Sequence, residues 1–389
     1  MLDLKSSIKF TQIPNESYPD RTNTFEFNFL NDFEMTSTWF NLSDTGKLIV
    51  PQKLSFRDKD GNLFSWNGKN ISGQTNTSPI LLRGDAISIT IGYYFYDAVQ
   101  QKRILVTDNV FNGYVSQVHS STPLEIELMD NMYRLQQTAA PNKQWIGYTI
   151  ENMVAELIKG TGFTLKTKVS GDNISNDIGD QYITENQTVA EVLLDLKKNY
   201  YVQSWFRGNE LRCSVATYFP DDRTNHKFKF QYNIISDTLE YKRKDDVVVG
   251  VQVYSQKQSV ENGVTKRGTT KYKIEKIKQF AVWNKGILNI YDEKPAGFQG
   301  EIRTLNFLAA TKEQLKKLVK ENINNVIYEG LEGTFTVFGL PFVKHGDSVT
   351  LIDDNMPDRN GTYIVNAIER YFGVNGYRQV ITIGTRIDV

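Results

Sequence analysis

Hydrophobic and polar residues alternate along much of the chain, which is typical of β-strands with one buried face. In residues 87–91 isoleucines alternate with serine and threonine, and in residues 124–128 leucine and isoleucine alternate with glutamate. Further strand-like runs occur at 247–253, 334–338, 363–368 and 380–383. Asn375-Gly376 lies between two strand-like runs, and this pair predicts a tight hairpin whose two turn residues both need positive φ.

Three stretches instead have the three- and four-residue spacing of amphipathic helices. The first is expected to begin near Thr149 and to end at Gly160. Capping boxes at 188–191 and 311–314 predict where the other two begin, because their side chains satisfy free backbone donors. The last helix is expected over 311–324, with Leu315 on its buried face. We interpret all three apolar stripes as core packing.

These elements divide the chain into three parts. Residues 1–137 are rich in strands, residues 138–220 combine helices with strands, and residues 221–389 are again rich in strands, with one helix. The fold class is therefore predicted to be mainly β with an α+β insertion. Residues 255–278 are polar and rich in lysine and arginine, and they are expected to form either a long hairpin or a loop.

One sequence element occurs twice. Gly84-Asp85 precedes a strand-like run, and Gly346-Asp347 does the same near the C-terminus. Each is followed by an Asn-Gly pair and by two apolar residues three positions apart, which are Val115 and Val118 in the first copy and Val365 and Ile368 in the second. Because Gly-Asp is common turn chemistry, the pattern suggests an internal duplication but does not establish it.

Charge and composition exclude several classes of protein. The chain has 389 residues, of which 45 are basic and 45 acidic, so its formal net charge is zero. A protein that grips nucleic acid along its length needs a basic excess. No run of 18 apolar residues is present, so no membrane span is predicted. A single cysteine, Cys213, excludes an intrachain disulfide and a zinc site built from cysteines.

The sequence offers few catalytic groups. Its three histidines, His119, His226 and His345, are far apart, and there is no His-Glu-x-x-His zinc motif, no Gly-x-Ser-x-Gly elbow and no phosphate-binding P-loop. Cys213 lies in a short alternating strand, where burial is expected rather than reactivity. We therefore predict no catalytic residues, no metal ligands and no cofactor.

Acidic and basic clusters have simpler interpretations. The adjacent aspartates at 221–222, 245–246 and 353–354 would point to opposite faces of a strand, so they are poor acid–base pairs. Residues 353–361 resemble a calcium loop, but Pro357 takes a ligand position and the twelfth-position glutamate is missing, so a turn is expected. Arg83-Gly84-Asp85 is interpreted as a hairpin turn, and the lysines of 266–278 as a solvated surface.

Several motifs occur in a familiar order. They begin with Gly84-Asp-Ala-Ile87, Phe111-Asn-Gly-Tyr-Val115 and Ile126-Glu-Leu-Met-Asp-Asn-Met-Tyr-Arg-Leu135, and continue with 187–200, Trp205-Phe-Arg-Gly208 and 333–378. In these motifs the chain resembles the baseplate hub, or late-control, proteins of contractile-tailed phages and related injection systems, above all those of phages with Bacteroidetes-type hosts. The resemblance covers nearly the whole chain and is weakest over 255–300.

The resemblance implies a fold with two tandem tube-like β-barrels. Residues 1–137 would form the first barrel, completed by about 226–245, and 138–220 would be the inserted α+β domain. Residues 221–389 would form the second barrel, with the helix at 311–324 beside it. The family likeness also strengthens the interpretation of the two Gly-Asp elements as a duplication.

The resemblance also implies a function without catalysis. A homotrimer with two barrels per chain has pseudo-six-fold symmetry, so it could join a hexameric tail tube to a trimeric spike at the baseplate of a virion. Expected partners are the tail tube protein or tube initiator, the central spike, the tape-measure protein and other baseplate proteins, with transient passage of DNA or effectors. Because the sequence ends at Val389 without a β-helix, the spike is expected to be a separate chain.

Two other functions stay open at this point. The 12% aromatic content suits a receptor-binding or carbohydrate-binding tail module. A tail-associated lytic enzyme is the other alternative, and the missing catalytic motifs weaken it.

Overall fold

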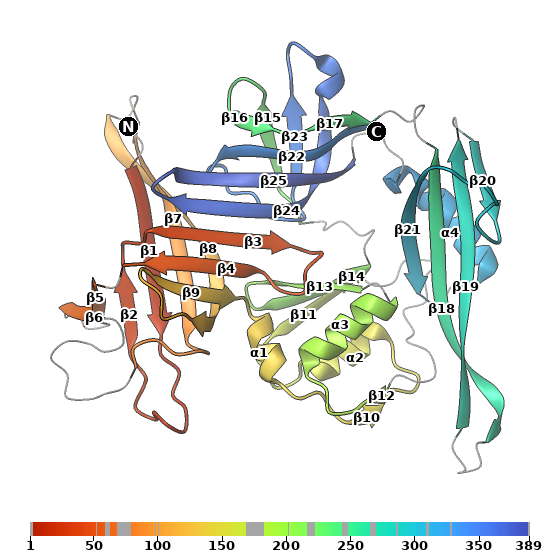
Figure 1. Cartoon of the computed structure of the whole chain (residues 1–389), viewed down its shortest axis with the longest axis horizontal. Coiled ribbons are helices and arrows are strands. Elements are labelled where there is room, and N and C mark those ends of the chain that lie inside the picture. Colours follow the sequence, from red (N-terminus) through yellow and green to blue (C-terminus); the bar gives the residue numbers. More distant parts are fainter. Residues whose placement is uncertain are drawn as a thin grey trace.

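The computed structural model describes most of the chain, and all structural statements concern that part. It covers residues 3–51, 53–58, 63–67, 79–97, 99, 101–168, 183–200, 202–215, 222–242, 248–264, 270–284, 287–308, 311–326 and 329–387. The described part is mainly β, as the alternating pattern predicts, with a large antiparallel sheet, a small α+β unit and a separate four-stranded sheet (Figure 1).

The large sheet contains strands from both ends of the chain. Its N-terminal strands are β1 (Asp3–Thr11), β2 (Thr24–Phe27), β3 (Asp32–Thr38), β4 (Thr45–Val50), β5 (Lys53–Asp58), β6 (Leu63–Asn67), β7 (Ala86–Asp97), β8 (Lys102–Val118) and β9 (Leu124–Met129). Its C-terminal strands are β15 (Asn225–Lys229), β16 (Ile234–Asp237), β17 (Glu240–Lys242), β22 (Gly330–Phe338), β23 (Ser348–Ile352), β24 (Gly361–Gly373) and β25 (Gly376–Arg386), with a 3₁₀ turn, η1, at Pro357–Arg359.

One antiparallel pairing joins the two halves of this sheet. Strand β3 pairs with β24 from Thr38 opposite Ala367 to Asp32 opposite Gly373. The described ladders therefore run as one path from β16 through β24 and β3 to β6, and they do not close either half into a separate barrel.

Residues 226–245 were expected to complete the first β segment, and this expectation is wrong. Strand β15 pairs in parallel with β23, while β16 and β17 pair with β22, so these strands belong to the C-terminal half. Phe228 and Phe335 meet edge-on, with ring centroids 5.3 Å apart, in the core of that half. Burial of these two aromatic rings therefore favours the packing of β15 in the C-terminal half, against residues that are distant in the sequence.

The α+β unit follows β9. It contains α1 (Met132–Gln137), β10 (Lys143–Gln144), α2 (Ile150–Leu157), β11 (Thr164–Lys168), β12 (Ile183–Thr184), α3 (Val189–Tyr200), β13 (Val202–Arg207) and β14 (Glu210–Val215). The first two helices predicted from the sequence are confirmed here. Thr149 caps α2 by accepting from the Asn152 amide, and Thr188 and Glu191 form the capping box of α3.

The four-stranded sheet is inserted in the sequence between β17 and β22 of the large sheet, and none of its described strands pairs with that sheet. It consists of β18 (Val249–Val264), β19 (Thr270–Asn284), β20 (Ile287–Tyr291) and β21 (Glu301–Leu308), and α4 (Lys312–Val326) packs on it. Of the two alternatives expected for residues 255–278, a long hairpin or a loop, the described residues form the hairpin strands β18 and β19. The predicted third helix is also confirmed, but Leu315 and Val319 pack on the valines of β18, whereas a barrel flank was expected.

The turn between β24 and β25 differs in detail from its prediction. Gly373 pairs with Gly376, so Val374 and Asn375 form the loop, and of the predicted pair only Gly376 has positive φ, at 92°. Hairpin loops that are followed by a glycine in the left-handed conformation are the next most common type after the I′ and II′ turns. The hairpin is thus confirmed with a different turn.

The two Gly-Asp turns share one hydrogen-bond pattern. The Gly84 amide donates to the Val115 carbonyl at 2.8 Å, and the Val115 amide donates to the Asp85 carbonyl at 2.9 Å. In the second copy the Gly346 amide donates to Val365 and the Val365 amide to Asp347, at the same two distances. Both glycines have positive φ, 94° and 84°. The repeated sequence element therefore has the same local structure twice, while superposition of the complete halves stays a prediction.

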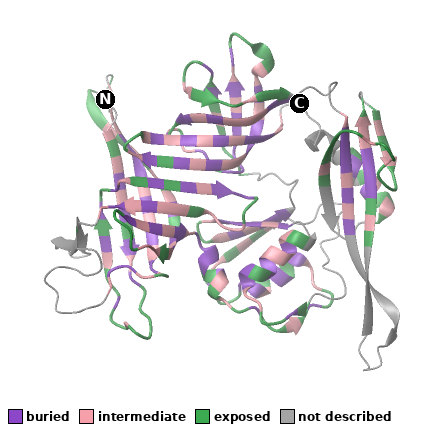
Figure 2. Ribbon diagram, viewed as in Figure 1, coloured by how far each residue is buried: buried purple, intermediate pink, exposed green. Residues whose placement is uncertain are grey.

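Burial follows the alternation on the sheet and the stripes on the helices (Figure 2). Separate apolar clusters lie in the N-terminal half, the α+β unit, the C-terminal half and the four-stranded sheet. The N-terminal cluster includes Phe372 and Tyr377 of the C-terminal hairpin, so the two halves share side chains as well as hydrogen bonds. None of the described helices has the length and apolarity that crossing a membrane requires.

Candidate functional site

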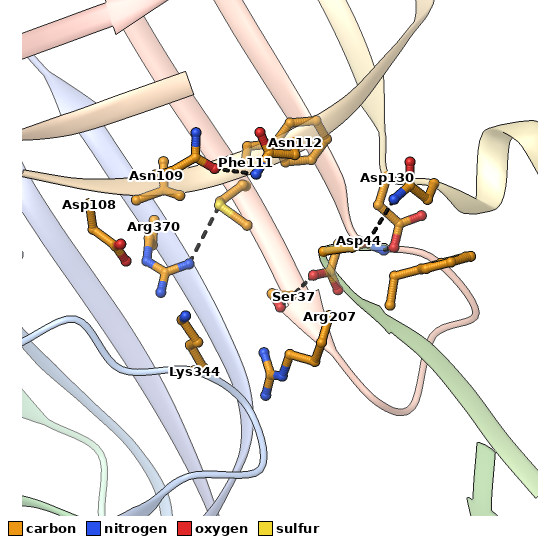
Figure 3. Close-up of a pocket in the computed structure, with 15 residues that line it drawn as sticks. Ser37, Asp44, Asp108, Asn109, Phe111, Asn112, Asp130, Arg207, Lys344 and Arg370 are labelled. Carbon is orange, nitrogen blue, oxygen red and sulfur yellow. Dashed lines mark hydrogen bonds between the residues drawn. The ribbon is translucent and has the colours of Figure 1, made fainter. Parts of the chain in front are cut away.

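A polar region lies where the two halves of the large sheet meet the α+β unit (Figure 3). A cavity of about 360 Å³ opens there, and β3, β8, β13 and β24 all contribute to its wall. We call it the junction cavity. Its charged side chains are Asp44, Asp108, Asp130, Arg207, Lys344 and Arg370. These residues are widely separated in the sequence, so the fold alone brings them together.

A serine, a histidine and an aspartate are in contact beside this cavity. Ser37 Oγ donates to Asp44 Oδ2 at 2.7 Å and lies 2.8 Å from Nδ1 of His345. In a hydrolytic triad the histidine stands between serine and aspartate, whereas here the serine stands between the other two. Burial, followed by the nearby arginines, holds the pKa of His345 well below its usual value. The histidine is therefore neutral, and the three groups form a buried polar link between β3 and the loop before β23.

Asp44 and Asp130 form the acidic side of the junction. Asp130 accepts from the Asp44 amide at 3.1 Å, from the Met132 amide at 2.9 Å and from the Ser43 hydroxyl at 2.9 Å. Burial raises the pKa of Asp44 to about 6. Burial, reinforced by the charge of Asp44, raises the pKa of Asp130 to about 7. Their hydrogen bonds tie the β3–β4 turn to the start of α1.

The three histidines from the sequence have separate environments. His119 Nε2 lies 3.0 Å from Glu127, and His226 Nε2 lies 3.1 Å from Asp347, at the second Gly-Asp turn. His345 is fully buried and packs against both Trp39 and Trp205.

Cys213 and the acidic pairs also have structural surroundings. Cys213 is buried beside Ser204, and burial raises the pKa of its thiol to about 12. Asp222 pairs with Arg212. Asp353 accepts from the amides of Asn355 and Met356, as expected for a turn. The pair at 245–246 lies outside the described residues, and so do residues 265–269 of the lysine-rich stretch.

Sequence reasoning missed one cluster of possible metal ligands. Ligand atoms of His119, Glu125 and Glu127 lie within 4.8 Å of one another on β9 and the turn before it. Lys47 already pairs with Glu125 at 2.9 Å, and His119 with Glu127, so these partners engage the cluster within the chain. The period of two on β9 places both glutamates on one face, but only the turn geometry adds the histidine.

No protein-family model matches the sequence, and no curated protein matches it either. Solved structures do match across the chain. The tail protein of Neisseria meningitidis MC58 has a TM-score of 0.54 at 12% identity, over 99% of this chain and 97% of its own. The 43 kDa tail protein of prophage MuSo2 from Shewanella oneidensis has a TM-score of 0.52 at 14% identity, over 98% of both chains.

A third match is the Francisella PdpA–VgrG complex in its half-lidded form. It has a TM-score of 0.51 at 10% identity, over 98% of this chain and 58% of the matched chain. The structural matches thus confirm the likeness to tail proteins that the sequence motifs indicate. At these identities the shared property is the fold, which this chain has in common with phage tail proteins along its whole length.

Proposed function

We propose that the chain is the structural hub of a phage-like tail, which joins a six-fold tail tube to a three-fold spike as a homotrimer. The observation that carries the proposal is the repeated Gly-Asp turn. Two halves that each contain the same turn can supply six similar units from three chains, and closed symmetric rings are the usual form of homo-oligomers.

The domain arrangement is part of this proposal. Residues 1–137 would form the first tube-like unit, 138–220 the inserted α+β domain and 221–389 the second tube-like unit. The pairing of β3 with β24 supports it, because that pairing sets two similar units side by side within one sheet. Closure into a ring would then require the neighbouring chains of the trimer.

An unpaired strand edge is available for that closure. Strand β16 stands at one end of the strand order and, among the described strands, pairs only with β22. Its Ile235 is exposed. Because β16 has only four residues and a bulge at Ile235, it offers another chain an exposed apolar contact at the open edge of the sheet. Strand β3, in contrast, pairs with β24 from the other half of the chain. This pairing shows how a strand edge can be covered.

The polar face of the large sheet suits the wall of a conduit. Tyr371, Glu34, Lys47 and Glu127 stand in one cross-strand row over β24, β3, β4 and β9. With Glu125 beside them, carboxylates outnumber the single lysine along this groove. An acidic wall does not hold DNA through phosphate contacts. Passage of DNA or effectors, without sequence-specific binding, is therefore the transport function we propose.

The proposed partners are the tail tube protein or tube initiator, the spike, the tape-measure protein and other baseplate proteins, at the tail tip of a virion. We propose no enzymatic role. The order of Ser37, Asp44 and His345, in which the serine separates the other two, supports this.

The test is the mass of the protein in solution. Multi-angle light scattering should give three chains at micromolar concentration. Ile235→Lys should shift the protein to monomer, because it puts a charge on the open edge, whereas Ile287→Lys on the exposed side of β20 should leave the trimer intact. A monomeric parent protein, or a trimer that tolerates Ile235→Lys, would contradict the proposal.

A further inference from the structure

The junction cavity contains a buried arginine whose charge is not balanced by a contact. Arg370 on β24 is 3% exposed. Its Nη1 lies 3.6 Å from the sulfur of Met35, and its Nη2 donates to the Val343 carbonyl, but its Nε has no hydrogen-bond partner. In the described part of the chain no carboxylate forms an ion pair with it. Buried charges are normally paired, so this arginine indicates a missing anion.

A second guanidinium faces the same space. Arg207, at the end of β13, donates through Nη2 to the His345 carbonyl, and burial lowers its pKa. Like Arg370, it has no ion-pair partner among the residues described. Lys344 lines the cavity as well, and its side chain is exposed, so it stands where solvent enters. Three cations from separate stretches of the chain thus converge on one cavity (Figure 3).

Two of the three carboxyl groups that line this cavity are hydrogen-bonded to other parts of the chain. Asp44 accepts from Ser37 and from the Thr38 amide, and Asp130 accepts from two backbone amides and one hydroxyl. Asp44 attracts Arg207 and Arg370 through space, but none of the hydrogen bonds of Asp44 and Asp130 goes to a guanidinium group. Asp108 is the remaining acidic residue of the lining.

The cavity is also large enough for a ligand. Its volume of about 360 Å³ exceeds the size of a carboxylate or phosphate group. Guanidinium groups bind such groups with two parallel hydrogen bonds, and an ammonium adds a point charge.

We propose that the junction cavity is an oxyanion site, in which Arg207, Lys344 and Arg370 bind a carboxylate or a phosphate group. The site goes beyond the hub function and does not depend on the trimer. A bound anion would supply the hydrogen-bond acceptor that Arg370 Nε lacks. It would also connect the α+β unit to the C-terminal half through shared contacts.

Binding should strengthen as the pH falls from 8 to 5.5. The charged and titratable groups that line the cavity are the three cations, Asp44, Asp108 and Asp130. The neutral His345 lies behind Ser37. Asp44 and Asp130, with pKa values of about 6 and 7, lose their negative charge over this range. The net charge of the cavity therefore becomes more positive, and the expected gain in affinity is several-fold.

The experiment uses the full chain and two probes, sulfate for the phosphate class and acetate for the carboxylate class. Thermal unfolding is followed at constant ionic strength, with chloride as the replaced salt. A saturable rise of the melting temperature with either probe is expected, and the effective probe identifies the class. Sulfate also stabilises proteins in general, but that effect does not saturate at a site.

Variants distinguish the site from a general salt effect. Lys344→Ala and Arg207→Gln should weaken the response several-fold, while Lys159→Ala, at an exposed lysine just after α2, should leave it unchanged. If Arg207→Gln does not fold, Lys344→Ala decides alone, because its side chain is exposed. Equal responses in the parent and Lys344→Ala, or no saturable response to either probe, would overturn the proposal.

Discussion

The Arg21 guanidinium and the Asp85 carboxylate form an ion pair at 2.5 Å whose side chains are only 2% and 1% exposed. Arg21 also donates to the carbonyl oxygens of Pro79 and Ile80. The pair therefore fixes the first Gly-Asp turn to the segment before β2. At the second turn Asp347 has His226 as its partner, and both side chains are more exposed, at 12% and 10%.

Asp85→Asn should lower the free energy of unfolding by about 3–5 kcal/mol, because it leaves the Arg21 charge buried without its partner. Asp347→Asn should cost clearly less, since its more exposed histidine partner can keep a hydrogen bond. Urea unfolding of both variants measures the difference. Equal losses at the two turns would show that burial of the pair is not what distinguishes them.

Protonation of Asp130 should make the folded state more stable in mild acid than at neutral pH. Its pKa is raised from 3.8 to about 7, so between about pH 4 and pH 7 the folded protein binds more protons than the unfolded protein. The contribution of this group to stability is therefore present at low pH and is lost as the pH rises through 7.

Asp130→Asn imitates the protonated form and should flatten this part of the pH dependence. Urea unfolding of the parent and the variant at pH 5.5, 6.5 and 7.5 would measure the effect. Asp354→Asn, on an exposed carboxyl group, provides the control. If the parent and the Asp130→Asn protein have parallel pH profiles, Asp130 is not the source of the pH dependence.

Leu315→Asp should destabilise the four-stranded sheet by about 3 kcal/mol or more, because Leu315 of α4 is fully buried against β18. Lys320→Asp, on the exposed side of the same helix, should change little. Thermal melting followed by circular dichroism compares the two. If Leu315→Asp melts like the parent, α4 does not depend on this contact.

Gly113→Ala should destabilise the N-terminal half by several kcal/mol. A Cβ at this position on β8 would collide with the carbonyl of Met129 on β9, so the strands could not keep their spacing. Asn112→Ala, at the exposed neighbouring position, should be nearly neutral. Chemical unfolding of both variants tests this, and a stable Gly113→Ala protein would mean that β9 can move away at little cost.

The sequence predicted those parts of the fold that depend on near neighbours. The caps at Thr149 and Thr188 lie within three residues of their partners, so local chemistry determines them. The repeated Gly-Asp turn was visible because both copies need the same left-handed glycine. The parallel pairing of β15 with β23 left no such signal, because the residues that it places opposite each other, such as Phe228 and Leu351, lie far apart in the sequence.

The junction cavity could not be predicted for the same reason. Asp44, Asp130, Arg207 and Arg370 occur in four unrelated sequence contexts, and no catalytic or ligand-binding motif connects them. The altered pKa values of the two aspartates arise mainly from burial, which depends on how the α+β unit sits against the sheet. Local spacing along the chain carries no information about that packing.

The sharing of core side chains between the two halves has a consequence for synthesis of the protein. The Tyr93 hydroxyl donates a hydrogen bond to the Tyr377 carbonyl at 2.6 Å. Phe372 and Tyr377 also pack in the N-terminal core. A ribosome must therefore release almost the entire chain before the N-terminal half can complete its core. Until then β3 keeps an unpaired edge, so a nascent or truncated chain is exposed to aggregation in a way that the finished protein is not.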